Sequence, residues 1–121
     1  MNKKILIISL ICLAVLIGIV LFFGKTMISS GGSKLIIFYS ETCPHCKNLE
    51  KFLEENKVSE KVSYIEKRVD DSQTNVAELI AKAKSCGIEN GVGIPFMWDA
   101  ENSKCVIGDV DIINFFQDKI K

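Results

Sequence analysis

The chain begins with an uninterrupted apolar segment. Residues 5–23 contain no charged side chain, and Lys3 and Lys4 stand directly before them. A helix of about 20 apolar residues reaches across the hydrocarbon core of a bilayer. The pattern therefore predicts an N-terminal transmembrane signal-anchor over residues 1–24, in which Cys12 is one small apolar residue among many.

The charges that flank this segment predict its orientation. Lys3, Lys4 and the amino terminus precede it, and Lys25 follows it closely. The excess of positive charge before the segment favours a cytoplasmic N-terminus, with the rest of the chain outside the cytoplasm at the cell membrane. A cleaved signal peptide with a cut site near residues 29–31 is the alternative, but the apolar run is longer than such peptides usually have.

A short polar stretch separates the apolar run from the rest of the chain. Residues 29–33 are only serine and glycine, a composition typical of a flexible linker, which we place at residues 25–33. Residues 34–121 then suffice for one small domain with a single core.

The apolar pattern of residues 34–121 alternates between strand and helix periods. Strands are predicted at residues 35–39, within 62–69, at 96–98 and at 105–107. Helices are predicted at residues 44–56, from a cap at Asp71 or Ser72 to a stop at Gly87, and from a cap at Asp109 onward.

The order of these elements predicts how the strands pair. A strand–helix–strand unit gives parallel strands, whereas two strands joined by the short turn at residues 99–102 form an antiparallel hairpin. We therefore expect an α/β fold with a mixed four-stranded sheet and three flanking helices.

The charge balance excludes one class of partner. The chain has 15 basic and 15 acidic residues and no formal net charge at pH 7. Nucleic-acid-binding domains usually carry a basic excess or a basic patch. We expect no nucleic-acid partner, and no cofactor is predicted.

A Cys-x-x-Cys motif lies where the first strand leads into the first helix. It consists of Cys43, Pro44, His45 and Cys46, and Thr42 precedes it. Pro44 suits the first helical turn, because its missing N–H would have no intrahelical partner there. Cys43 then lies at a helix N-terminus, where free N–H groups and the helix dipole favour a thiolate. Since the thiolate is the nucleophilic form of cysteine, the motif predicts a reactive dithiol.

This motif and the order of the elements resemble the thioredoxin superfamily in its short, glutaredoxin-like form, over nearly all of residues 34–121. Gly93, Ile94 and Pro95, before the third strand, match the cis-proline loop of that family. The resemblance implies that the Ile94–Pro95 bond is cis, that this loop faces the dithiol, and that Ile94 and Pro95 contact the substrate chain.

The Cys-Pro-His-Cys sequence is shared with periplasmic disulfide oxidases of the DsbA type. An imidazole at His45, beside the attacking sulfur, is expected to stabilise the Cys43 thiolate. Stabilising the reduced form makes the corresponding disulfide a stronger oxidant.

Two departures narrow the resemblance. Thioredoxins and DsbA-type oxidases carry a buried acid six residues before the first cysteine, and Ile37 occupies that position here. The usual proton acceptor is therefore missing, as in glutaredoxins. Residues 108–111 match only in part the Gly-Gly-x-x-Asp stretch through which glutaredoxins bind glutathione, so the sequence does not support glutathione use.

Cys86 and Cys105 are the other cysteines of the domain. Cys86 continues the apolar stripe of the second helix, and Cys105 begins the fourth strand. Outside the cytoplasm an even number of cysteines permits a second disulfide between them. Two separate buried thiols are the alternative.

Together these features predict a membrane-tethered thiol-disulfide oxidoreductase. Cys43 is expected to form the mixed disulfide and Cys46 to resolve it, with Pro44 and His45 completing the catalytic motif. His45 and the outer location favour an oxidase or isomerase over a reductase. The alternatives are a copper or zinc module that uses the Cys-x-x-Cys and a redox-inert interaction domain.

Three kinds of partner follow from this hypothesis. Protein thiols or disulfides are the expected substrates, and an unidentified membrane protein is the expected redox partner. The lipid bilayer is the third, through residues 5–23.

Overall fold

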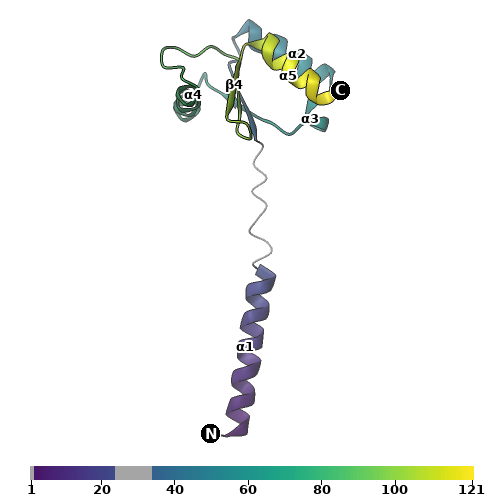
Figure 1. Ribbon diagram of the computed structural model, residues 1–121, viewed down its shortest axis with the longest axis vertical. Helices are drawn as coiled ribbons and strands as arrows, with labels where there is room; N and C mark the ends of the chain where they lie inside the picture. Colours follow the sequence, from purple (N-terminus) through teal and green to yellow (C-terminus); the bar gives the residue numbers. More distant parts are fainter. Residues whose placement is uncertain (1, 24–33) are drawn as a thin grey trace. The chain divides into compact units, whose positions relative to one another are not determined.

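The computed structural model describes residues 2–23 and 34–121, which form two units (Figure 1). In the first unit the described residues form the helix α1 (Lys3–Phe23), along which apolar side chains such as Ile5 and Leu16 are 59% and 60% exposed. Within the described ranges, no helix meets both the length and the apolarity that a membrane span requires. The predicted helix is present, and its membrane span stays a prediction. The predicted linker at residues 25–33 lies outside the described residues.

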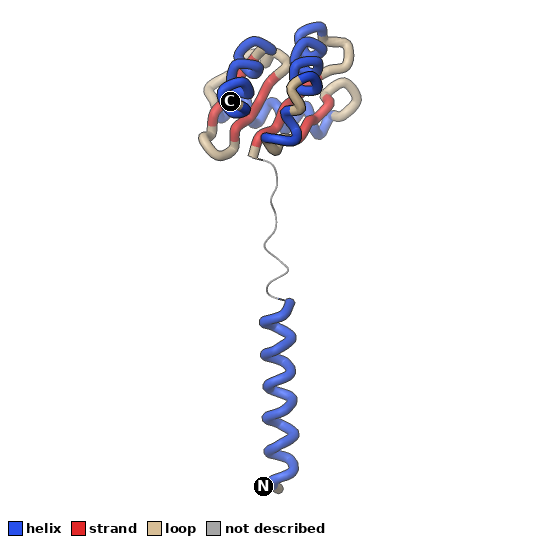
Figure 2. The backbone as a smooth tube through the Cα atoms, turned by 90° about the vertical axis from the view of Figure 1, so that its right-hand side faces the viewer, coloured by secondary structure: helices blue, strands red, loops and turns tan. Residues whose placement is uncertain are grey.

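The second unit is a four-stranded sheet flanked by helices (Figure 2). Its strands, in chain order, are β1 (Leu35–Tyr39), β2 (Ile65–Arg68), β3 (Phe96–Asp99) and β4 (Lys104–Ile107). The spatial order is β2-β1-β3-β4. β1 and β2 are parallel, whereas β3 is antiparallel to both β1 and β4. This mixed sheet confirms the predicted thioredoxin-like α/β architecture.

Helices cover both faces of this sheet. They are α2 (Pro44–Glu55), α3 (Val58–Lys61), α4 (Gln73–Ser85) and α5 (Asp109–Ile120). In Figure 1, α2 and α5 lie together on one side of the strands and α4 lies on the other. The sheet is thus the central layer of a three-layer sandwich.

Two cores result from this layering, one on each face of the sheet. Ile37 and Met97 pack with residues of α2, α3 and α5, whereas Phe38 and Phe96 pack with residues of α4. Neighbouring strand residues belong to different cores because successive side chains point to opposite faces of a sheet. β1 and β3 are central strands covered on both faces, which explains why their sequences are apolar runs without polar alternation.

The structure corrects two local predictions. The sequence pattern did not predict α3, a single turn that follows Lys57 in a left-handed conformation with φ 49°. The N-cap of α5 is Gly108, with φ 91°, and not Asp109. Glycine adopts a positive φ without steric cost. Asp109 therefore becomes the first helical residue, and its carboxylate is available to other partners.

The N-cap of α4 is Ser72, and not Asp71, the other predicted candidate. Its side-chain oxygen accepts a hydrogen bond from the Asn75 backbone N–H at 3.2 Å. Ile80, which helical spacing places on the apolar stripe, is 43% exposed. The apolar face of α4 is therefore only partly covered by the sheet.

Candidate active site

Cys43 is the N-cap residue of α2, and Pro44 is the first residue of that helix. The backbone of Cys43 is extended (φ −88°, ψ 118°), and its side chain makes no capping hydrogen bond. The short connection from β1 thus places this thiol at the end of a central strand, beside the free N–H groups of a helix N-terminus. The thiol is not occupied in holding the helix.

The two thiols of the motif differ in their surroundings. Both are free, but Cys43 is partly exposed whereas Cys46 is 5% exposed. Burial raises the pKa of the Cys46 thiol to about 12, and the neighbouring Cys43 adds to the rise. Cys43 is therefore the sulfur that a substrate can reach, and Cys46 holds its proton firmly at neutral pH.

The loop before β3 lies directly against the reactive sulfur. The Ile94–Pro95 peptide bond is cis, as the resemblance implies, and the Cys43 thiol donates a hydrogen bond to the Ile94 carbonyl at 3.7 Å. The Pro95 carbonyl in turn accepts from the Gly108 N–H at 2.9 Å. The start of α2, the cis-proline loop and the start of α5 thus meet at one place.

The start of α5 contributes Asp109, which the sequence pattern predicts as a helix cap. The Asp109 carboxylate accepts a hydrogen bond from the Asn48 side chain at 3.0 Å and pairs with His45 Nδ1 at 3.1 Å. These contacts, the Asn48 bond foremost, hold the pKa of Asp109 below its usual value. His45 is thus directed to Asp109, while its side chain remains 69% exposed.

The sequence pattern did not predict a role for Asn48 in this site. Its spacing from His45 could have indicated that role, because residues three apart lie on the same face of a helix.

The loop that carries Cys43 is fastened to the end of β2. The Glu41 backbone N–H donates to the Asp70 carboxylate at 2.8 Å, and Arg68 bridges the carboxylates of Glu41 and Asp71. Bonds from the Ser40 hydroxyl and the Glu41 N–H, in that order, lower the pKa of Asp70. This network orients the loop from the edge of the sheet.

An apolar groove extends from Ile94 along α4. It has a volume of about 410 Å³ and is lined by one wall on α4, which includes Leu79 and Ile80, and by another between Ile88 and Ile94. Glu89 is the one charged residue among the lining residues that the structure describes. The groove therefore offers an apolar surface next to the reactive sulfur.

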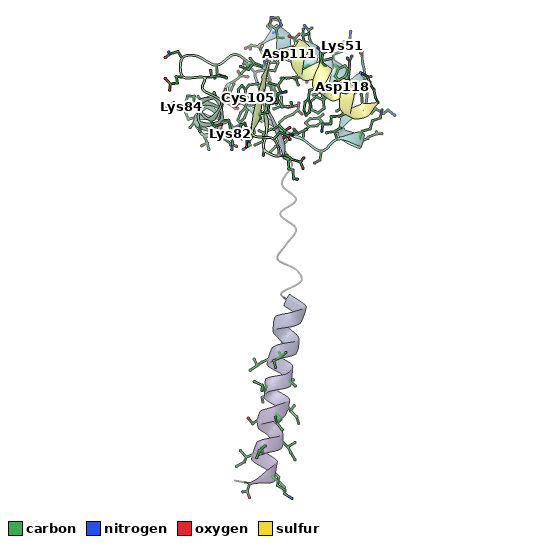
Figure 3. All side chains as sticks on the ribbon, viewed as in Figure 1. Lys51, Lys82, Lys84, Cys105, Asp111 and Asp118 are labelled. Carbon is green, nitrogen blue, oxygen red and sulfur yellow. A yellow bond between two sulfur atoms is a disulfide. The ribbon has the colours of Figure 1, made fainter. Side chains whose placement is uncertain are left out.

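Cys86 and Cys105 form a disulfide in the structure. Cys86 is the C-cap residue of α4, and Cys105 belongs to β4. Figure 3 shows Cys105 on the side of the sheet toward α4 and Lys82. The closed loop spans residues 87–104, and it includes the cis-proline and one wall of the groove.

The metal alternative stays a prediction. A structural metal site needs several ligating side chains together. Within residues 2–23 and 34–121, no group of three or more histidine, cysteine, aspartate or glutamate side chains is placed to hold a metal ion.

Residues 35–92 match the family model of glutaredoxin, a segment that contains the dithiol and ends shortly before Ile94. No curated protein matches the chain. Three observations indicate the same kind of domain: the matched segment, the mixed four-stranded sheet and the pair of one partly exposed and one buried thiol. The chain therefore carries a thioredoxin-like domain that is similar to glutaredoxin, and thiol redox chemistry is the activity that this domain indicates.

Proposed function

We propose that the protein is a membrane-tethered thiol-disulfide oxidoreductase that acts on protein thiols or disulfides through Cys43 and Cys46. One observation carries the proposal: a reachable Cys43 thiol lies 3.7 Å from the Ile94 carbonyl, beside a cis-proline, with Cys46 buried one turn deeper. A substrate sulfur that approaches Cys43 meets the cis-proline loop beside it and a second thiol behind it.

The exchange runs in two steps. The Cys43 thiolate attacks a substrate disulfide, forms a mixed disulfide and releases one substrate thiolate, which takes up a proton. Cys46 then loses its proton and attacks the Cys43 sulfur. The second substrate thiolate leaves, so the substrate disulfide is reduced and a Cys43–Cys46 disulfide is formed. The same steps in reverse oxidise a substrate dithiol.

We expect the substrate to be a polypeptide. The Ile94 backbone can pair with an extended chain, and the groove beside it can receive an apolar side chain near the substrate cysteine. Glutathione carries two carboxylates, and the described lining of the groove offers them Glu89 but no lysine or arginine. Charge therefore favours an uncharged or basic peptide segment.

An oxidase or isomerase role is favoured by His45. This ring lies in the first turn of α2, two residues after Cys43, and pairs with Asp109. An imidazolium in that turn stabilises a thiolate at Cys43. The reduction potential should lie nearer the oxidising end of the range of roughly −120 to −270 mV known for such proteins. Redox titration against glutathione tests this directly, and a potential at the reducing end would contradict the oxidase assignment.

Membrane tethering rests on the apolar run of residues 5–23 and on the exposed apolar side chains of α1. Such side chains lose contact with water when they enter lipid. The lysines before the run favour a domain outside the cytoplasm. Alkylation of Cys43 in intact cells by a membrane-impermeant reagent, compared with lysed cells, tests both the location and the orientation.

Substrate trapping tests the enzymatic proposal. A Cys46→Ser variant cannot resolve the mixed disulfide, so it should accumulate disulfide-linked partners that reducing agent releases. Cys43→Ser is the matched control and should trap none. If the two variants trap the same partners to the same extent, the assignment of attacking and resolving cysteines is wrong.

A further inference from the structure

A small cavity lies behind the buried thiol, between α2 and the edge of the sheet. Its volume is about 110 Å³, and its lining includes Ile37, Cys46, Tyr64 and the three carboxylates of Glu50, Glu54 and Glu66. A cavity of this size with polar groups in its wall is large enough to hold water. Cys46 thus lines the same cavity as three acidic side chains.

The strand register places one of these acids beside Ile37. Ile37 on β1 pairs with Glu66 on β2, and paired residues on adjacent strands project from the same face of a sheet. Glu66 therefore faces α2 from the neighbouring strand. The acid that is missing at position 37 has a counterpart one strand away.

The chemistry of Cys46 requires such a group. The proposed function needs Cys46 to become a thiolate, yet its thiol is buried and is surrounded by apolar residues such as Leu49 and Ile37. We infer that Glu66 is the proton acceptor for Cys46 in the resolving step, acting through water in this cavity. The inference rests on the proposed function.

The Cys46 thiol gives its proton to the Glu66 carboxylate, and its sulfur attacks the Cys43 sulfur of the mixed disulfide. The Cys43–Cys46 bond forms, the bond from Cys43 to the substrate breaks, and the substrate leaves as a thiolate that takes the proton from Glu66. In the reverse direction, protonated Glu66 supplies the proton to the departing Cys46 thiolate.

The surroundings of Glu66 support this role. Desolvation, with smaller effects from the charges of Glu50 and Glu54, raises the pKa of Glu66, which makes its carboxylate a stronger base. Several other titratable or charged groups lie around the cavity or near the two thiols: Tyr39 on β1, Tyr64 before β2, Glu50 and Glu54 on α2, Cys43 at the N-cap and Asp70 after β2.

The two other carboxylates of the cavity are less suitable acceptors. Glu50 already pairs with the Lys47 ammonium at 2.7 Å, so its carboxylate is engaged with a side chain outside the described lining of the cavity. Glu54 is two turns further along α2 than Cys46, about 12 Å by the rise of a helix. Glu66 comes from the opposite wall, on the edge strand β2, where the residue is exposed, and it forms no ion pair among the described residues.

The resolving step can be measured on its own in the full-length chain. Full-length protein that carries Cys12→Ala, which removes the third free thiol, and that is reduced at Cys43 and Cys46 is mixed in a stopped-flow instrument with an aromatic disulfide such as dithiobis(nitrobenzoate). The reagent releases one coloured thiolate when Cys43 attacks and a second when Cys46 resolves. Glu66→Gln should leave the first phase unchanged. It should slow the second phase by at least about tenfold at neutral pH and remove the carboxylate inflection from its pH profile.

Glu50→Gln is the matched control and should change the second phase by less than about twofold, since general-base effects are much larger than that. The inference is overturned if the Glu66→Gln second phase keeps the wild-type rate and pH profile, or if Glu50→Gln slows it equally. Cys46→Ser identifies the second phase by abolishing it. A second phase that survives in Cys46→Ser would instead overturn the proposed function.

Discussion

The domain holds two pairs of cysteines that differ in almost every respect except residue type. Cys43 and Cys46 are free thiols within the first turn of α2, whereas Cys86 and Cys105 form a disulfide between residues 19 apart in the chain. The first pair lies at a helix N-terminus beside a backbone carbonyl, and the second joins a helix C-terminus to a strand. The backbone position of each pair therefore explains its role: the first pair is placed to react, and the second pair cross-links the fold.

The two pairs are nevertheless connected through one loop. The Cys86–Cys105 disulfide closes the segment that contains Ile94, Pro95 and one wall of the apolar groove. Ile94 is also the residue whose carbonyl accepts the hydrogen bond from Cys43. The cross-linking pair therefore holds part of the surface on which the reactive pair is proposed to act.

Removing the reactive sulfur should have the largest effect. Cys43→Ser should reduce thiol exchange with a disulfide-bonded peptide to the uncatalysed rate, because serine cannot form the mixed disulfide. A Cys86→Ala, Cys105→Ala double variant should still catalyse this exchange, with a loss that is small beside that of Cys43→Ser. Comparable losses in both proteins would show that the two pairs do not have separate roles.

The cross-linking pair should matter chiefly for stability. The Cys86→Ala, Cys105→Ala double variant should lose about 3 kcal/mol of unfolding free energy, since a disulfide across a loop of this length restricts the unfolded chain. Urea denaturation of the full-length chain measures the loss. The Cys43→Ala, Cys46→Ala variant is the control, and an equal loss there would contradict the distinction.

The fold was largely predictable from the sequence because its main signals are local. β1 and β3 are apolar runs, and α2 combines Pro44 with an apolar stripe, so each is specified by its own residues. α3 was not predictable, since a helix of one turn shows no period. The cap at Gly108 was missed because Asp109 offers a stronger local capping signal than glycine.

The site was predictable only where the chain itself places residues together. Cys43, His45 and Cys46 are adjacent in sequence, and the resemblance supplied Ile94 and Pro95. Asp109 lies 64 residues from His45, and Glu66 reaches the cavity behind Cys46 through strand register. Contacts of this kind depend on the pairing and packing of whole elements, which no local pattern encodes.

The Asp109 hydrogen bonds connect α2, which carries the reactive pair, to α5. They are the counterpart of the disulfide that connects α4 to β4. Asp109→Asn should cost about 1–2 kcal/mol near pH 7 by weakening charged hydrogen bonds. The folded pKa of Asp109 is lowered, so its contribution is present above the unfolded pKa and is lost as the pH falls through the folded pKa. The stability gap between wild type and variant, measured by urea denaturation, should therefore narrow below the ordinary carboxyl pKa of 3.8. A gap that stays constant from neutral to acidic pH would contradict this assignment.

The smallest expected effect concerns the groove wall that faces the cross-linked loop. Ile80 is 43% exposed, so Ile80→Ser should change stability by less than about 0.5 kcal/mol. It should slow exchange with a peptide that carries an apolar residue beside its cysteine by about fivefold, which corresponds to about 1 kcal/mol of lost apolar burial. Exchange with a small aromatic disulfide should be unaffected. Val110→Ser on α5, a residue 65% exposed, is the matched control.

Repeating the Ile80→Ser measurement without the Cys86–Cys105 disulfide decides whether the two cysteine pairs cooperate. If the disulfide holds the opposite wall of the groove in place, its removal should weaken peptide binding by itself. Ile80→Ser should then cost less than fivefold in that background, because a contact across a loosened groove is already partly lost. Fully additive effects would mean that the disulfide stabilises the fold without shaping the surface beside Cys43.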